Sequence, residues 1–438
     1  MSLLGGFLQT MGTRVFCLAV TVAASVLTAR LLGPEGKGIL TVLGTLTATL
    51  AQFGNLGLTA ANVHFAAQRP GERPQLAAVS LWVAAGMGAL LAGLALAVSV
   101  WRPDLLSEIP LSLLVVAVLS LPFLLASQLL QSLLLGMEAI PAFNLLDVFR
   151  TVVGLAVLVV LAGLGWFTVA ALVWTSSLLA VLGAAVTWGL IRERSRMAWR
   201  FARGFLREML GYGMVFFLNN LLAFLLLKSD YFLVNSLLGV REVGVYSVAV
   251  QIADLLLLVP ATVATLLFPR LSAIADTAER TRMCLQCARI TAGAMAVGCA
   301  LVGGLGPWVV AWVWGAAFAP AWVSLVLLLP GVWILTLENV VVMHLAAERL
   351  PLAIPVLWLS GLLLNVGLNL WWLPRLGPAG AAMTSSIAYA AVSVGVFWLF
   401  QRRTGAGWAA LLVPRAEDWR TLTRRLRETL GVRVPAGA

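Results

Sequence analysis

Charged side chains are scarce in this sequence. Only 11% of its 438 residues are Asp, Glu, Lys or Arg, whereas a soluble globular domain carries about 25%. Apolar residues make up 61% of the chain, so the charged groups are too few to cover a solvated surface. These proportions exclude a soluble enzyme, a disordered chain and a coiled coil. Because a bilayer-spanning helix needs about 20 apolar residues, the apolar content allows roughly thirteen spans at most.

Cysteine and histidine are also rare, which limits disulfide and metal chemistry. Cys284 and Cys287 form a lone CxxC with no second pair and no nearby histidine. This pattern predicts neither a disulfide framework nor a zinc site. The two histidines, His64 and His344, lie near the ends of apolar runs, where hydrogen-bonded structural roles are expected. We expect no bound metal and no cofactor.

The motifs of ATP-driven transport and of common hydrolases are missing. The run from Gly33 to Gly38 contains a Gly-Lys pair but lacks the spacing and the Ser/Thr of a P-loop. The sequence has no HExxH motif and no long loop with paired carboxylates. We therefore expect a protein that is not an enzyme.

What the chain does have is a series of long apolar runs. Gly, Pro and charged residues break these runs into twelve predicted spans. The spans cover about 8–32, 39–66, 76–100, 111–135, 144–164, 168–191, 209–237, 244–268, 283–305, 322–345, 352–373 and 378–400. The strands of an outer-membrane barrel alternate apolar and polar residues, so continuous runs favour helices. The predicted fold class is all-α, a polytopic membrane protein with about twelve transmembrane helices.

The basic residues predict the orientation of these spans. With the N-terminus inside, 21 Lys and Arg residues fall in cytoplasmic segments and five in outer loops. Lys and Arg concentrate on the cytoplasmic side of membrane proteins, so both termini are predicted to be cytoplasmic. The net charge of +11 is then a topology signal, and we expect no binding to nucleic acid.

An internal repeat divides the chain into halves. Leu31-Leu32-Gly33 followed by Gly38 recurs as Leu237-Leu238-Gly239 followed by Gly244. Thr175-Ser176-Ser177 recurs as Thr384-Ser385-Ser386. These matches predict two parallel six-helix repeats, which in transporters place the binding site between them near the midplane.

The repeat predicts four parts of the chain. They are an N-lobe at 1–191, a basic cytoplasmic linker at 192–208, a C-lobe at 209–400 and a basic cytoplasmic tail at 401–438. Linker and tail alternate Arg with apolar residues at helical spacing. Both are predicted to form amphipathic helices on anionic membrane lipids, although a solvated helix is the alternative for the tail.

Charged residues inside the spans are the first candidates for function, because a charge in hydrocarbon is costly. Arg14 is predicted to bind substrate, with snorkelling to the cytoplasmic surface as the alternative. Lys228 is predicted to bind an anionic ligand, with an ion pair to a neighbouring helix as the alternative. Asp254 is the candidate for proton or sodium coupling. Asp147 and Arg150 have the spacing of an intrahelical ion pair.

Side-chain amides are the second group of candidates. Gln52, Asn55 and Asn62 follow one face of the span 39–66, and Asn219 and Asn220 lie on the span 209–237. We expect these amides to contact substrate, and interhelical hydrogen bonding is the alternative for each. A polar cavity of this kind suits a sugar-bearing or otherwise hydrated ligand.

At this point the chain resembles a known family. The run Ala29-Arg30-Leu31-Leu32-Gly33-Pro34-Glu35-Gly36-Lys37-Gly38, the run Leu267-Phe268-Pro269-Arg270-Leu271-Ser272 and the run Leu373-Pro374-Arg375-Leu376-Gly377-Pro378-Ala379-Gly380-Ala381-Ala382 carry the resemblance. They are similar to motifs of the polysaccharide (O-antigen, Wzx-like) flippases. These belong to the multidrug/oligosaccharidyl-lipid/polysaccharide (MOP) exporter superfamily.

The resemblance implies a fold, a function and a location. It implies two six-helix lobes forming a V and working by alternating access in the bacterial cytoplasmic (inner) membrane. The implied substrate is an undecaprenyl-diphosphate-linked oligosaccharide, moved to the outer leaflet for surface polysaccharide biosynthesis. A glycan polymerase and glycosyltransferases are the implied partners.

The sequence differs from two related groups, the MurJ proteins and the MATE exporters, at positions typical of each. Arg14 matches an arginine found early in the first helix of such flippases, but Val20 or Thr21 stands where MurJ proteins carry a further arginine. This argues against lipid II as the substrate. The acidic cation site of many MATE exporters has no clear match in the first lobe. A MATE-like, cation-coupled exporter of small molecules or drugs remains the alternative function.

Overall fold

The computed structural model describes residues 3–103, 108–194, 203–348 and 351–413. Within these ranges every regular element is a helix. Residues 195–202 of the predicted linker at 192–208, and the tail beyond residue 413, lie outside the described residues. The predicted amphipathic character of these two segments remains a prediction.

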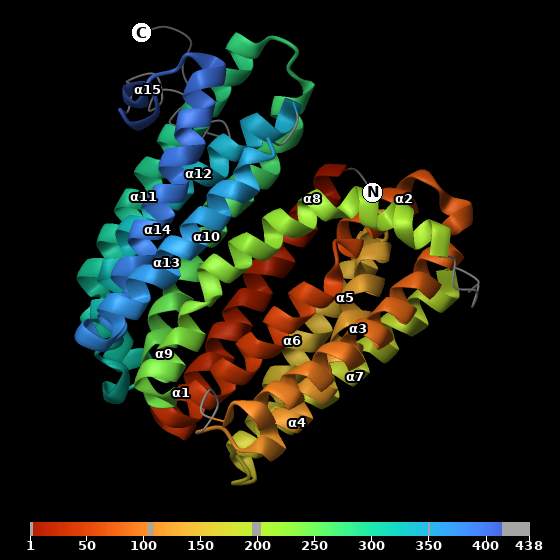
Figure 1. The fold of residues 1–438 in the computed structure, drawn as a ribbon, viewed down its shortest axis with the longest axis vertical. Helices are drawn as coiled ribbons and strands as arrows, with labels where there is room; N and C mark the ends of the chain where they lie inside the picture. The colour runs from red at the N-terminus through yellow and green to blue at the C-terminus, as the bar shows by residue number, and fades with distance from the viewer. Residues whose placement is uncertain (1–2, 104–107, 195–202, 349–350, 414–438) are drawn as a thin grey trace, which may run out of the picture. The chain divides into compact units, whose positions relative to one another are not determined.

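Figure 1 shows the helices in chain order. The first half contains α1 (Leu3–Asn55), α2 (Leu58–Gln68), η1 (Pro70–Glu72), α3 (Arg73–Trp101), α4 (Leu111–Leu119), α5 (Leu121–Gly136), α6 (Ile140–Gly163) and α7 (Val169–Arg194). The second half contains α8 (Arg203–Lys228), α9 (Asp230–Leu238), α10 (Val240–Ala273), α11 (Thr277–Val313), η3 (Ala316–Phe318), α12 (Ala321–Glu348), α13 (Ala353–Leu376), α14 (Pro378–Thr404) and α15 (Trp408–Leu412).

The first helix folds back on itself at Gly33. A straight helix of its 53 residues would be about 80 Å long, far more than a bilayer. Gly33 has a φ of 68° and a ψ of −173°, which favours glycine because a Cβ would clash there. Beyond this turn Lys37 Nζ donates to Ser25 Oγ at 2.6 Å. In Figure 1 the N-terminus and α2 accordingly lie at the same end of the bundle.

Counting the two arms of α1 separately restores the predicted number of spans. Eleven helical segments among the described residues are long and apolar enough to cross a membrane, and α1 is counted once among them. Its two arms therefore bring the total to twelve. The predicted all-α, polytopic fold is confirmed.

The two copies of the sequence repeat pack against each other. A Cβ on Gly38 would fall inside contact distance of the Val240 carbonyl, and a Cβ on Gly244 would do the same at the Pro34 carbonyl. The contact is reciprocal, because residues 34 and 38 stand in the first copy where 240 and 244 stand in the second. Only glycine allows two helix backbones to approach this closely.

The packing divides the chain into two compact units. One contains residues 1–247 with 311–319, and the other contains residues 248–310 with 320–438. This boundary falls within α10. The predicted lobes at 1–191 and 209–400 describe the sequence repeat, and they remain a prediction.

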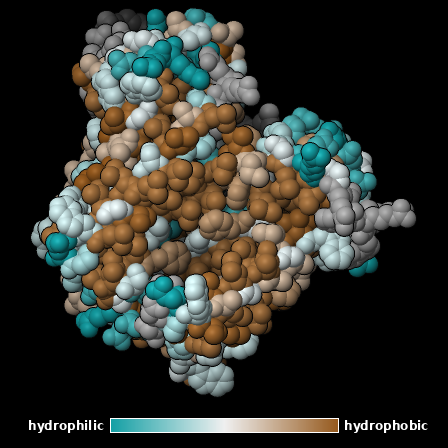
Figure 2. All heavy atoms as spheres, in the orientation of Figure 1, coloured by the Kyte–Doolittle hydropathy of each residue, from teal (hydrophilic) through white to brown (hydrophobic). Residues whose placement is uncertain are grey.

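The surface of the helices matches a membrane environment. Figure 2 shows hydrophobic residues along the middle of the helices and hydrophilic residues gathered near their ends on the face drawn. Trp308 and Trp312 are strongly exposed near the end of α11, and tryptophan at a helix end is typical of the lipid–water interface. The protein is a multi-pass membrane protein.

Candidate functional site

Lys228 lies in a small pocket between α1, α8 and α9. The pocket has a volume of about 300 Å³. Its lining includes Thr41 and Thr45 from α1, Phe224 from α8 and Tyr231 from α9. Lys228 Nζ lies 5.8 Å from the centre of the Tyr231 ring. The pocket therefore combines one cation, two hydroxyl groups and two aromatic rings inside a predicted span, which suits an anionic ligand that also carries polar groups.

The α1 wall of this pocket has room at Gly44. A Cβ on Gly44 would meet no other atom within 4 Å. Gly44 and Leu40 also line a second cavity on another side of α1. The Lys228 pocket and this second cavity therefore share the segment of α1 around Leu40 and Gly44.

The second cavity has a volume of about 510 Å³ and lies among α1, α4, α5, α6 and α7. Hydroxyl side chains line it, and each donates to a backbone carbonyl: Thr21, Thr47, Ser120, Thr151, Thr175, Ser176 and Ser177. Arg150 also lines the cavity. The cavity wall is mainly apolar, with hydroxyl groups and one guanidinium group among its lining residues.

Arg150 and Asp147 are joined through Gln131 instead of forming the predicted ion pair. Gln131 Nε2 donates to Asp147 Oδ1 at 2.8 Å, and Arg150 Nη1 donates to Gln131 Oε1 at 3.2 Å. Arg150 Nη2 also donates to Ser127 Oγ. The prediction of a direct ion pair is wrong, because a glutamine from α5 lies between the two charged groups.

The predicted amides on α8 lie close to the Lys228 pocket along the helix. Asn220 is exposed, and Asn219 is half-buried. Asn219 Oδ1 is buried and accepts no hydrogen bond from the described residues. Both amides lie about two turns before Lys228 on α8. The structure thus places three of the predicted site residues on one helix.

The predicted residues on α1 are more dispersed. Arg14 is exposed on the first arm, and Gln52 is half-buried on the second arm. Neither lines the Lys228 pocket, whose α1 residues fall between Leu40 and Ala48. The structure therefore does not bring Arg14 and Lys228 into one pocket.

Asn55 and Asn62 make hydrogen bonds within the protein. Asn55 Oδ1 accepts from the Thr59 backbone N–H at 3.1 Å and from Thr59 Oγ1 at 2.8 Å. Asn62 is fully buried. Its Nδ2 contacts Ser80 Oγ at 2.9 Å, the Leu129 carbonyl at 3.0 Å and Ser132 Oγ at 3.1 Å. These contacts begin α2 and tie it to α3 and α5.

The coupling candidate Asp254 lies on α10 in the second unit and is exposed. Among the described residues, no cluster of three or more His, Cys, Asp or Glu is arranged to hold a metal ion.

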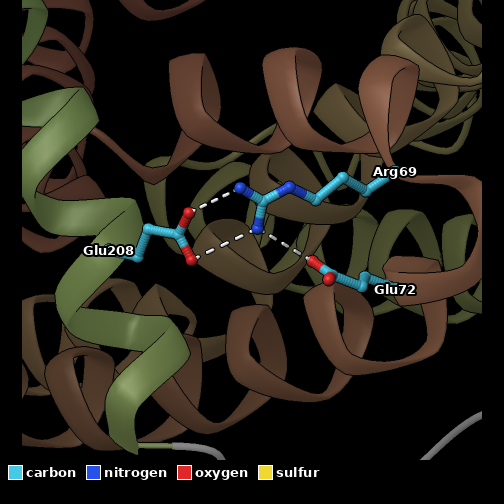
Figure 3. A network of polar contacts seen from close by, with 3 residues as sticks. All are labelled: Arg69, Glu72 and Glu208. Atoms are coloured by element: carbon cyan, nitrogen blue, oxygen red, sulfur yellow. Dashed lines mark hydrogen bonds and ion pairs between the residues drawn. The ribbon is translucent and has the colours of Figure 1, made fainter.

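Charged and aromatic contacts hold α8 against α2. Arg69 donates to both carboxylate oxygens of Glu208 at 2.7 and 3.3 Å, and to Glu72 at 3.3 Å (Figure 3). Hydrogen bonds to Glu208 and then Glu72 raise the pKa of Arg69 above its ordinary value. One turn away on each helix, His64 and Tyr212 stack with their ring centres 4.1 Å apart. Together these contacts fix the beginning of α8.

Comparison with protein families shows the family to which this chain belongs. Residues 27–323 match a family profile described as "Polysaccharide biosynthesis protein". This segment is more than half of the chain. The chain belongs to this family. A search of curated proteins finds no match.

Two solved structures have a similar fold. The chain is similar to the lipid II flippase MurJ in an inward closed conformation, with 13% identity and a TM-score of 0.71, over 98% of this chain and 93% of MurJ. It is also similar to an inward-facing multidrug resistance MATE transporter of the MOP superfamily, with 15% identity and a TM-score of 0.70, over 88% of this chain and 94% of the transporter. The predicted MOP-type fold is confirmed.

No prediction from the sequence covered several residues of α8 and its neighbours. They are the aromatic side chains Tyr212, Phe216 and Phe224, of which Phe224 lines the Lys228 pocket, and the Arg69–Glu208 pair near the beginning of α8. The aromatic residues recur at multiples of four positions, a spacing that puts helix residues side by side. The ion pair leaves no local signal, because its partners are 139 residues apart.

Proposed function

We propose that this protein is a flippase for an undecaprenyl-diphosphate-linked oligosaccharide in the bacterial cytoplasmic membrane, with both termini in the cytoplasm. It would work by alternating access and serve surface polysaccharide biosynthesis. Membership of the polysaccharide biosynthesis family supports the pathway. The observation that carries the proposal is the Lys228 pocket, a cation with hydroxyl and aromatic neighbours inside a predicted span.

The physical requirement of flipping explains why such a pocket is needed. A diphosphate cannot cross hydrocarbon without a large desolvation cost, because water no longer solvates its charge. Lys228 would offset part of that charge, and Thr41 and Thr45 would replace hydration. Asn219, Asn220, Gln52 and Arg14 would supply further polar contacts along α8 and α1. We assign Asn62 to the scaffold, since protein groups already bond to both ends of its amide. We assign Asn55 to the scaffold because its Oδ1 accepts two hydrogen bonds from Thr59 at the start of α2.

Energy supply and partners complete the proposal. An ion gradient acting through Asp254 would drive the cycle. A glycan polymerase and glycosyltransferases would supply and consume the lipid-linked oligosaccharide. These assignments follow from the family resemblance and from the position of a carboxylate inside a predicted span.

The test is the sidedness of lipid-linked oligosaccharide in cells lacking the protein. We expect full-length oligosaccharide on undecaprenyl diphosphate to accumulate in the inner leaflet and surface glycan to disappear. Lys228→Ala should fail to restore surface glycan, whereas Lys228→Arg should restore part of it. Arg241→Ala, which removes an exposed cation near the beginning of α10, is the matched control and should restore it fully.

Unchanged sidedness and normal surface glycan, in cells without a second flippase, would contradict the proposal. Cation-driven efflux of organic cations from the same cells would then support the MATE-like alternative.

A further inference from the structure

A ridge of large side chains runs along α8 toward Lys228. Tyr212, Phe216, Asn220, Phe224 and Lys228 recur at every fourth residue. Residues four apart on a helix are surface neighbours and form a continuous ridge. Five such positions extend about 24 Å along the helix axis. We call this set the α8 ridge.

The aromatic members of the α8 ridge present accessible rings. The rings of Tyr212 and Phe216 lie 6.0 Å apart and differ in tilt by 30°. Tyr212 is 37% exposed and Phe216 is 45% exposed, so each keeps ring surface free for a ligand. His64 stacks on Tyr212 at 4.1 Å. The Tyr212 ring is therefore held in place before any ligand arrives.

The polar members of the ridge indicate that it borders water. Asn220 is exposed within the segment that crosses the membrane. An amide turned to hydrocarbon without a hydrogen-bond partner costs several kcal/mol, so polar side chains in spans face a hydrated space. Farther along, Phe224 and Lys228 line the pocket described above. If the ridge faced only lipid, its amide and its ammonium group would be left without solvation.

We propose that the α8 ridge binds pyranose rings of the glycan, a role that rests on the flippase function proposed above. The C–H face of a pyranose is apolar and carries weakly positive hydrogens, which match the negative face of an aromatic ring. The sugar hydroxyls then bond to the amide of Asn220. Lys228, at the end of the ridge, binds the anionic group that joins sugar and lipid.

This arrangement has a consequence for specificity. Stacking uses the face that pyranoses share, so the ridge recognises sugar rings as a class and tolerates changes in individual hydroxyl groups. Lys228 recognises charge alone. Loss of an aromatic ring should therefore weaken the binding of glycan-bearing lipid and leave the binding of bare undecaprenyl diphosphate unchanged.

Affinity measurements with two defined lipids test the ridge. The full-length protein in nanodiscs is titrated with undecaprenyl diphosphate and with undecaprenyl diphosphate carrying a trisaccharide, using native mass spectrometry. We expect the wild type to prefer the trisaccharide lipid. Tyr212→Leu and Phe216→Leu should each reduce that preference about two- to tenfold, the range expected for one aromatic contact. Phe216→Tyr keeps a ring and should retain the preference.

Two controls separate binding from folding. Phe123→Leu removes a ring with similar exposure, 43%, from α5, and should change neither affinity. Unaltered binding of bare undecaprenyl diphosphate by the ridge variants shows that they are folded. A full trisaccharide preference in both leucine variants, or no preference in the wild type, would overturn the proposal. Failure of the flippase function would instead appear as normal lipid sidedness in cells lacking the protein.

Discussion

Replacement of Asn62 by leucine separates a scaffold role from a role in substrate binding. The side chain is fully buried, and its amide contacts two serine hydroxyls and a backbone carbonyl on α3 and α5. Leucine keeps most of the volume and forms none of these hydrogen bonds. Ser132 still donates to the Leu129 carbonyl at 2.6 Å, so Ser80 is the group most affected by the substitution.

The magnitude follows from these hydrogen bonds. Interhelical side-chain hydrogen bonds in membranes contribute about 0.6 kcal/mol each, and a buried polar group without a partner costs about 1–3 kcal/mol. Because the variant lacks the amide and leaves the Ser80 hydroxyl without its amide partner, we expect Asn62→Leu to reduce stability by about 2–4 kcal/mol. The affinity of the remaining folded protein for lipid-linked glycan should not change.

The assay combines unfolding in detergent with binding measured on the folded fraction. Gln52→Leu is the matched control, because Gln52 is only half-buried on α1 and is proposed to contact substrate. Gln52→Leu should alter binding and leave stability nearly unchanged. The reasoning is refuted if Asn62→Leu unfolds like the wild type, or if it weakens binding without any loss of stability.

Three other perturbations test separate parts of the structure. Gly38→Ala should destabilise the fold by at least about 1–3 kcal/mol, the usual cost of overpacking, because the added methyl group meets the Val240 carbonyl. The size-exclusion profile of extracted protein measures the loss of folded protein. Arg69→Glu should lower the melting temperature slightly, because exposed ion pairs contribute little, and the added change Glu208→Arg should restore most of the loss. Asp254→Asn should make glycan translocation in proteoliposomes insensitive to the proton or sodium gradient that drives the wild type.

Each of these three predictions has a control variant or a result that would contradict it. Gly44→Ala adds the same methyl group to α1 in open space and should fold normally, whereas equal behaviour of Gly38→Ala and Gly44→Ala would refute the close helix contact. An Arg69→Glu/Glu208→Arg double variant no more stable than either single variant would show that the pair is not coupled. Gradient-dependent translocation by Asp254→Asn would remove that carboxylate from the coupling mechanism.

The helical spans could be predicted from the sequence with good accuracy. The predicted span 378–400 is α14 (Pro378–Thr404), and the predicted span 76–100 is α3 (Arg73–Trp101). The prediction of two spans joined near Gly33 also agrees with the fold-back of α1. Such spans depend on local chain properties, namely apolar length and the residues that interrupt it.

The roles of individual polar residues could not be predicted in the same way. Asn62 and Asn220 are both amides on apolar helices, yet the first is fully buried in hydrogen bonds and the second is exposed. Asp147 and Arg150 have ion-pair spacing, but Gln131 from another helix lies between them. Each outcome depends on side chains that are distant in sequence.

The sequence by itself determined that the protein is a helical membrane protein, where its spans lie and which residues carry charge or amides within them. These properties follow from apolar length and composition, because each segment must itself be long and apolar enough to span the bilayer. Only the tertiary structure decided which of those polar groups face a cavity and which hold helices together. That choice depends on how the helices rotate and pack against one another, because a buried polar group takes its partner from whichever helix lies opposite.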